Sequence, residues 1–530
     1  MSLPDRQYHD DKRPSVASIR APSATDKLRR HRIAFGPLLE IGLLLGTAWG
    51  LCALLFVGYQ GMDDLHYVVA AERWFLDPPF IGENQWHNRL PMVLAMATSF
   101  RLFGETEWAL VAPNVLLYSL FVVGFWAMLR RWFGQFVAVT ASLLLITMPL
   151  FAIYTTIPYP FTFETVLVVS GCGLLIHTVH LQRRDHLPAA ILAGLCLGIA
   201  ILNRQTAVAA LLALAPLGLL SLERWRSWLA TGLSLGALGI GEFLWYWSAT
   251  GDPFHRLQVD AEGHRIPSAH LEGGTFEGSP FFNVDLMSRW KPAGTFDVHW
   301  LVNPYLDFFT SPNFGLVMWL AVPALLLMLY HRSQLQTEER RVLAPLILLA
   351  VVWFLVIVYV LSLRPQARYF GPIMAVSAMV AGLGLRQLLL LGYTRLTVGL
   401  LLVVVGTNLL LAGARDRPLR LEREMVKLAS TVDGVVHAPA QLLARAGFFV
   451  RSGGLGARLS GAPATPGSHE ILLLAPGEAP LPGLTVVGVA PRQYRPLGRV
   501  LAGLAGRLGV PGHLREHLAG ETTSLILVQR

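Results

Sequence analysis

The sequence predicts an α-helical protein that crosses a membrane many times and ends in a small α/β domain outside it. Of its 530 residues, 53% are hydrophobic and only 15% are charged, and the mean hydropathy is +0.50. A soluble protein of this length is less apolar. Long apolar segments recur through residues 34–412, whereas residues 413–530 alternate short β-rich runs with Gly and Pro.

About eleven apolar segments approach the roughly 20 residues that a helix needs to cross the hydrocarbon. They fall near residues 34–57, 108–129, 135–153, 162–181, 187–203, 206–222, 228–248, 314–331, 342–361, 370–391 and 396–412. Residues 90–100 form a shorter apolar piece, which we expect to lie in the outer membrane interface.

The basic residues predict the orientation of these spans. Eight precede the first span: Arg6, Lys12, Arg13, Arg20, Lys27, Arg29, Arg30 and Arg32. With every span counted once, the other basic loops fall on the same side, which the positive-inside rule assigns to the cytoplasm. We therefore interpret the net charge of +9 as a topology signal and expect no nucleic-acid partner. The first span has no cleavage site after it and should remain as an anchor in the lipid bilayer.

Three parts follow from this map. Residues 1–33 form a basic cytoplasmic tail, residues 34–412 a transmembrane domain with exoplasmic loops 58–107 and 249–313, and residues 413–530 an exoplasmic domain. In the last part RLEREMVKLAS has a helical pattern, while VDGVVHA, EILLLAP, LTVVGVA and TTSLILVQR predict strands. The sequence contains no Walker motif and no GxGxxG after a predicted strand. It therefore supports neither ATP-driven transport nor a Rossmann cofactor.

MDDLHY places two adjacent carboxylates directly after the first span. One interpretation is structural, because Asp63 and Asp64 would open a helix and favour the positive end of its dipole. The other is catalytic. A carboxylate of raised proton affinity in a partly dehydrated cavity would remove the proton from an acceptor hydroxyl as its oxygen attacks a sugar carbon. The adjacent acid, or His66, would then orient the acceptor.

MDDLHY resembles the start of the first exoplasmic loop in the C-type (GT-C) glycosyltransferases. These membrane enzymes use polyprenyl-phosphate sugars and include protein O-mannosyltransferases and lipid A aminoarabinose transferases. The resemblance covers most of residues 34–390, and this region looks like that of bacterial family 39 members. It is carried further by HNRLPMVLAMATSFRLFGETEWALVAPNVLLYSLFVVGFWAMLRRWFG, TGDPFHRLQVDAEGH, NPYLDFFTSPNFGLVMWLAVPAL and RPQARYFGPIMAVSAM. The family's usual Pro-Asp near the fourth span is replaced by Pro158-Tyr159-Pro160.

The resemblance implies an inverting transfer, in which a lipid phosphate leaves and the acceptor oxygen attacks from the opposite face. The first acid of the pair is the usual base in related enzymes, which favours Asp63, with Asp64 positioning the acceptor or sharing the proton. A polyprenyl-phosphate sugar suits an exoplasmic enzyme, which has no cytosolic nucleotide sugar. The lipid-linked sugar would be a substrate, and no essential cofactor is expected.

The leaving phosphate needs cations, and the planar fork of Arg pairs two phosphate oxygens. Arg368 is the first candidate, followed by Arg89 and Arg204. Each has an alternative role. Arg89 could extend to lipid head groups, Arg204 could cap helix ends or pair with Glu164, and Arg368 could be an interfacial anchor.

Further exoplasmic side chains are candidates for contacts with the donor or the acceptor. They are His66, Tyr67, His87, Glu164, His255, Asp260, His264 and Tyr369, with Trp86 and Trp300 as candidate sugar contacts. Structural pairing of Glu164 and a solvated surface for the residues of the long loop stay open. Their Asp and His types leave a divalent metal as an alternative, but their spacing forms no tight constellation that supports one. Cys52, Cys172 and Cys196 lie in apolar runs and predict neither a disulfide nor a zinc site.

Two other functions compete with glycosyl transfer. A secondary transporter would also be polytopic, but its charges would lie near the membrane midplane on broken helices. A non-catalytic assembly subunit of a cell-envelope glycan pathway would use the C-terminal domain as its partner surface. Within the leading hypothesis the acceptor is a glycolipid, a polysaccharide or a protein Ser/Thr, and the location is the bacterial inner (cytoplasmic) membrane, with the C-terminus in the periplasm.

Overall fold

The computed structural model describes residues 24–181, 186–265, 303–361, 366–414, 418–462, 468–474, 484–489, 498–510, 512, 515 and 524–529. The chain separates into two units, Met1–Leu43 and Leu44–Arg530, and the site described below belongs to the second. The domain limits expected at residues 33 and 412 stay a prediction.

Helices coincide with all the predicted spans. Seven are long and apolar enough to cross a membrane: α1 (Ala24–Leu54, apolar from Gly36), α4 (Glu107–Phe133), α7 with η1 (Phe161–Leu181), α10 with η3 (Leu222–Thr250), α15 with η6 (Thr337–Val360), α16 (Gly371–Leu390) and α17 (Thr394–Gly413). The other four predicted spans fall on shorter helices, α5 (Gln135–Thr147) followed by α6 (Pro149–Tyr154), α8 (Leu187–Asn203), α9 (Val208–Leu220) and α14 (Val317–Tyr330). The chain is thus a multi-pass membrane protein.

Local sequence explains where these helices begin and end. Thr106 precedes α4 and its hydroxyl accepts the amide of Ala109 at 3.1 Å, while Gly134 ends the helix at a φ of 86°. A capping hydroxyl satisfies an amide that has no partner in the helix, and glycine adopts positive φ without a Cβ clash. Pro149 starts α6 immediately after α5 and divides that predicted span into two helices.

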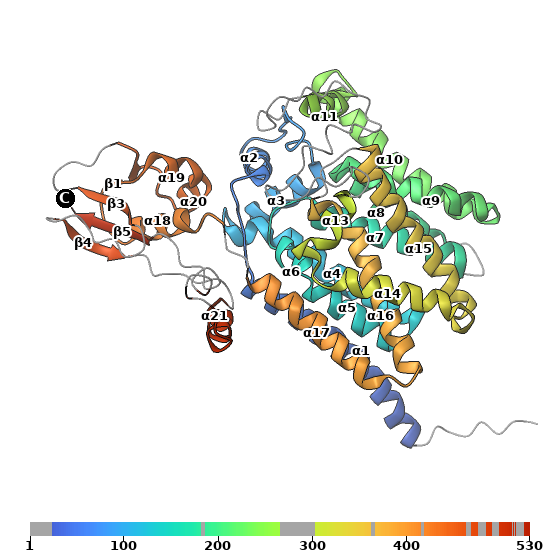
Figure 1. Cartoon of the computed structure of the whole chain (residues 1–530). Helices are drawn as coiled ribbons and strands as arrows, with labels where there is room; N and C mark the ends of the chain where they lie inside the picture. Colours follow the sequence, from blue (N-terminus) through green and yellow to red (C-terminus); the bar gives the residue numbers. More distant parts are fainter. Residues whose placement is uncertain are drawn as a thin grey trace, which may run out of the picture. The chain divides into compact units, whose positions relative to one another are not determined.

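Close packing in the bundle depends on small side chains. A Cβ atom on Gly194 of α8 would lie 2.1 Å from the hydroxyl of Ser234 on α10, and one on Gly384 of α16 would lie 2.2 Å from Ala324 on α14. α16 is buried along most of its length and passes through the middle of the bundle (Figure 1). Helices approach this closely when only hydrogen occupies the contact point.

The two predicted loops contain helices of their own. Loop 58–107 holds α2 (Asp63–Leu76) and α3 (Leu90–Phe103), the latter being the apolar piece that was expected not to cross. Loop 249–313 holds α11 (His255–Arg265) and α13 (Asn303–Thr310). Trp300 lies outside the described residues.

The C-terminal part has the predicted α/β character. Its five strands are β1 (Val436–His437), β2 (Leu459–Ser460), β3 (His469–Leu474), β4 (Thr485–Val489) and β5 (Ser524–Gln529), in the order β2-β1-β3-β5-β4. β5 pairs antiparallel with β3 and β4, while β1 pairs parallel with β2 and β3. Helices α18 (Arg420–Ser430), α19 (Ala440–Arg445) and α20 (Gly447–Ser452) accompany the sheet, and α21 (Gly498–Arg507) precedes β5 (Figure 1). Met425 and Leu428 of α18 pack with Val436, Ile471 and Leu527.

Candidate active site

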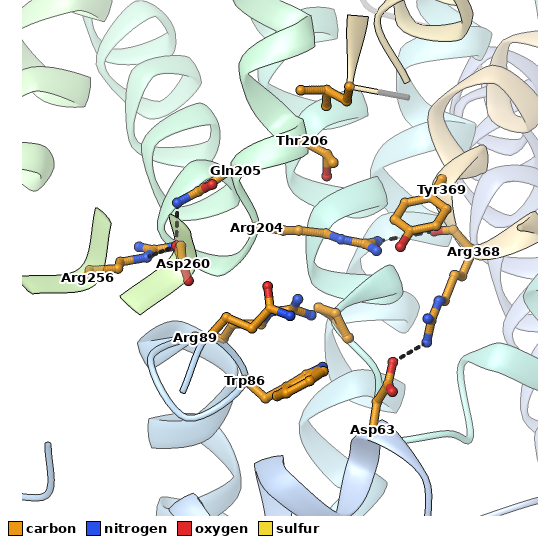
Figure 2. A pocket seen from close by; sticks show the side chains of 13 residues that line it. Asp63, Trp86, Arg89, Arg204, Gln205, Thr206, Arg256, Asp260, Arg368 and Tyr369 are labelled. Carbon is orange, nitrogen blue, oxygen red and sulfur yellow. Dashed lines mark hydrogen bonds and ion pairs between the residues drawn. The ribbon is translucent and has the colours of Figure 1, made fainter. Parts of the chain in front are cut away.

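A cavity of about 320 Å³ collects polar side chains from segments far apart in the sequence. Figure 2 shows those on which the site depends. They are Asp63, Trp86, Arg89, Arg204, Gln205, Thr206, Arg256, Asp260, Arg368 and Tyr369. Most of them lie where a helix begins or ends, which is why residues of five separate segments meet at one end of the bundle.

Asp63 and Arg368 form an ion pair in the cavity wall. Asp63 is the first residue of α2, and Arg368 belongs to the short helix η7 (Ala367–Tyr369) just before α16. Nη1 of Arg368 donates to Oδ2 of Asp63 at 2.6 Å, and both side chains keep part of their surface exposed. The sequence predicts both residues for the site but not their pairing.

Asp64 has different surroundings from Asp63. Its side chain is fully buried, its Oδ1 accepts the amide of Met62 at 2.7 Å, and its Oδ2 accepts the amide of Gln60 at 2.5 Å. Burial raises the pKa of Asp64 to about 6, although the amide bonds oppose this change. Asp64 therefore holds the turn that precedes α2, and its expected role in positioning an acceptor stays a prediction.

Arg204 has its own counter-ion. Its Nη1 donates to Oε2 of Glu164 at 2.9 Å, and Glu164 also accepts the hydroxyl of Thr206. The Arg204 guanidinium lies 4.1 Å from the ring centroid of Tyr369, a cation–π distance. The pairing with Glu164, which the sequence left open as an alternative, is thus present, and Arg204 still lines the cavity.

Arg89 is the cation of the cavity with the fewest anionic neighbours. It donates to the hydroxyl of the buried Tyr67, whose ring centroid lies 5.2 Å from the guanidinium. Among the residues that the structure describes, no carboxylate lies within ion-pair distance of it. Burial lowers the pKa of the Arg89 guanidinium, and an anion beside it would oppose that change.

Two histidines lie behind the cavity wall. His66 stacks on Trp86 with ring centroids 4.6 Å apart, and its ring centroid is 5.7 Å from that of His87. Nε2 of His87 is 3.2 Å from the side-chain amide nitrogen of Asn84. Burial lowers the pKa of both rings, that of His87 to about 4. The lowered pKa keeps the His87 ring neutral at pH 7, so this ring adds no charge beside the cavity.

Helix α11 borders the cavity with Arg256 and Asp260. Asp260 accepts the side-chain amide of Gln205 and lies 3.5 Å from Nε of Arg256, which in turn donates to Glu242. His255 points elsewhere, with Nε2 3.4 Å from the carbonyl oxygen of Gly82. His264 belongs to α11, but its side chain lies outside the described part.

Several cavity residues were absent from the sequence-based prediction. Gln205 and Thr206 directly follow Arg204, and Arg256 stands four residues before Asp260. The i,i+4 spacing of Arg256 and Asp260 is a helical ion-pair pattern that could have identified the first of them. Within the described residues, no cluster of three or more His, Cys, Asp or Glu side chains could hold a metal ion.

The turn before Asp63 is fixed from a distant segment. Nη2 of Arg423, in α18, donates to the carbonyl oxygens of Val57 and Tyr59 at 2.8 Å each and to Oε1 of Glu107 at 2.6 Å. The same Glu107 oxygen accepts the amide of Tyr59 at 3.1 Å. One guanidinium thus joins the end of the first span to the start of α4.

Comparison with known proteins agrees with this fold. Residues 85–247 match the family model of dolichyl-phosphate-mannose-protein mannosyltransferases. The match includes Trp86, Arg89, Glu164 and Arg204. No curated protein sequence matches the chain.

Solved structures extend the fold beyond the matched segment. The Archaeoglobus fulgidus oligosaccharyltransferase AglB, solved with an inhibitory peptide and a dolichol-phosphate, is 12% identical with a TM-score of 0.51 over 79% of this chain and 63% of its own. The A. fulgidus oligosaccharyltransferase with zinc and sulfate is 10% identical with a TM-score of 0.50, and the match covers 79% of this chain and 62% of its own. ArnT from Cupriavidus metallidurans bound to undecaprenyl phosphate is 13% identical with a TM-score of 0.49, and the match covers 88% of this chain and 97% of its own. The chain thus spans about three fifths of the archaeal enzyme's length.

Proposed function

We propose that this multi-pass membrane protein is a C-type (GT-C) glycosyltransferase, which transfers a sugar from a polyprenyl-phosphate donor to an acceptor hydroxyl. The transfer inverts the configuration at the sugar carbon, and Asp63 is the general base. The acceptor belongs to a glycolipid, a polysaccharide or a protein. The enzyme works in the bacterial inner membrane, with the cavity and the C-terminus on the periplasmic side.

The observation that carries this proposal is the carboxylate of Asp63 in a cavity bordered by four arginines. Arg368 engages only Oδ2 of Asp63, and Oδ1 has no partner among the described residues. This second oxygen is the proton acceptor in the proposed reaction. As the acceptor oxygen bonds to the sugar carbon, its proton moves to Oδ1 and the carbon–oxygen bond to the phosphate breaks.

The departing phosphate takes the electron pair of the broken bond. Its developing charge is stabilised by guanidinium groups that are already in place and need not reorganise. Arg89 is suited to this because it has no carboxylate partner among the described residues, and Arg204 and Arg368 contribute through donors not used by their partners. The dolichyl-phosphate-mannose description of the matched family and the dolichol-phosphate of the archaeal structure support a lipid-linked donor.

Transfer in proteoliposomes tests the proposal. The purified protein is supplied with radiolabelled polyprenyl-phosphate sugars and a panel of glycolipid, glycan and peptide acceptors. Wild type should transfer label, and Asp63→Asn should lower kcat by about 100-fold or more, as loss of a general base does. The matched control is Asp252→Asn, because the Asp252 carboxylate accepts the amide of Phe254 near the start of α11 and does not line the cavity.

Two results would overturn the proposal. Equal rates for wild type and Asp63→Asn would remove Asp63 from the chemistry. If no donor is consumed while a solute crosses the bilayer, the protein is a secondary transporter instead. The orientation is tested separately with a reporter fused after Arg530, which should be active only in the periplasm.

A further inference from the structure

A second cavity lies against the Asp63–Arg368 ion pair. It has a volume of about 430 Å³, and both residues of the pair line it as well as the first cavity. The ion pair is therefore a shared wall between two spaces. A base in such a wall can receive a proton from a molecule on one side while the sugar donor occupies the other.

The two cavities differ in charge. The first is lined by Arg89, Arg204 and Arg256 in addition to the shared pair. The described lining of the second contains no carboxylate, histidine, lysine or arginine beyond Asp63 and Arg368, which neutralise one another. Its other polar groups are the phenols of Tyr154 and Tyr159 and the side-chain amides of Gln60 and Gln366.

These uncharged groups are arranged to contact hydroxyls. The Tyr159 hydroxyl donates to Oε1 of Gln60 at 3.2 Å, and the Tyr159 ring centroid lies 5.3 Å from the Arg368 guanidinium. Burial raises the pKa of Tyr159 well above its ordinary value, so its hydroxyl remains a neutral donor and acceptor. The rest of the wall is mainly aliphatic, with Ile153 and Ile157 almost fully buried.

We propose that this second cavity is the acceptor subsite and that it takes a neutral sugar. This inference rests on the proposed function and names its acceptor class. Phenols, side-chain amides and an apolar wall match the hydroxyls and the C–H face of a pyranose ring. An anionic group in this cavity would instead lie beside the Asp63 carboxylate, and the cation it would meet in the lining is Arg368, whose charge Asp63 already neutralises.

The proposal gives Gln60 and Tyr159 a role in acceptor specificity. The sugar hydroxyl that reacts approaches Asp63 from the second cavity, and its proton passes to Oδ1 of Asp63. The oxygen forms the new bond to the donor sugar, whose phosphate departs into the arginine-rich cavity. Phosphorylated acceptors are excluded by charge rather than by size.

Matched acceptors test this directly. Label transfer from a polyprenyl-phosphate sugar is measured with octyl glucoside, octyl glucoside 6-phosphate and a serine-containing peptide. Tyr159→Phe removes one hydroxyl and should raise KM for octyl glucoside about three- to tenfold, the effect of one lost hydrogen bond, with KM for the donor unchanged. The control is Tyr118→Phe, a buried tyrosine of α4 that lines neither cavity.

A binding assay keeps the inference testable apart from transfer. Saturation binding of tritiated octyl glucoside to the protein without donor should weaken in Tyr159→Phe and in Gln60→Leu but not in the control. The proposal fails if the 6-phosphate competes equally well, if only the peptide is accepted, or if Tyr159→Phe changes KM for the donor instead. If no donor supports transfer but the protein still binds the glucoside, the proposed function is wrong while the sugar site is retained.

Discussion

Arg204 and Glu164 form a buried ion pair, with Nη1 2.9 Å from Oε2 and relative exposures of 7% and 1%. We expect Glu164→Gln to lower the free energy of unfolding by about 3–5 kcal/mol, because it removes the carboxylate that neutralises the buried Arg204 charge. Thermal unfolding in detergent measures this loss. The double variant Glu164→Leu with Arg204→Met should recover much of the stability and remain inactive, and a double variant as unstable as the single one would contradict this account.

Arg89 should determine donor affinity. Arg89→Gln removes a cation that has no carboxylate partner among the described residues, so no buried acid is left behind. We expect affinity for undecaprenyl phosphate to fall about 10- to 100-fold, the range for a lost charge-assisted hydrogen bond. Equilibrium binding of labelled undecaprenyl phosphate measures it. Arg101→Gln, on the exposed surface of helix α3, which begins directly after Arg89, should bind like wild type.

Arg368 should affect the rate more than it affects acceptor binding. Arg368→Ala should lower kcat by about 100- to 1,000-fold, as the loss of one preorganised charge stabiliser does. Arg368→Lys should recover part of the rate, because it keeps the charge but loses the planar fork. Steady-state kinetics separate kcat from KM. A change confined to KM for the acceptor would show that Arg368 does not stabilise the leaving phosphate.

The pH dependence of stability should reveal Asp64. Its folded-state pKa of about 6 exceeds the ordinary Asp value of about 3.9, so its contribution is complete below pH 4 and is lost as the pH rises to 6. The loss is on the order of 3 kcal/mol. The difference in Tm between wild type and Asp64→Asn should therefore fall from pH 4 to 6 and stay level above that. A constant difference over this interval would contradict burial as the cause.

Much of the fold could be predicted because membranes impose a simple rule on sequence. Apolar length alone located the spans, and β-rich runs located four strands, but β2 is only Leu459–Ser460 and carries no such run. The sequence predicts Asp63 for the site from its place after the first span and the family resemblance, and Arg89, Arg204 and Arg368 because a leaving phosphate needs cations.

The pairing of those residues could not be predicted. Nothing in MDDLHY shows that Asp63 faces a cavity while Asp64 binds backbone amides, because adjacent residues on a helix point in directions about 100° apart. Tyr159 was noticed only as a departure from the family pattern. Its contact with Gln60 joins residues 99 positions apart, and such contacts depend on how the helices pack.

The contacts of Arg423 limit which C-terminal segments from other proteins could replace residues 413–530. A chimera that took residues 413–530 from another protein would keep every predicted span. Without an arginine at position 423, however, the carbonyl oxygens of Val57 and Tyr59 and the carboxylate of Glu107 would lose their shared donor. The turn that presents Asp63 would then loosen, although no residue of the cavity had changed. An exchange that keeps this turn must therefore transfer Arg423 together with the segments it contacts.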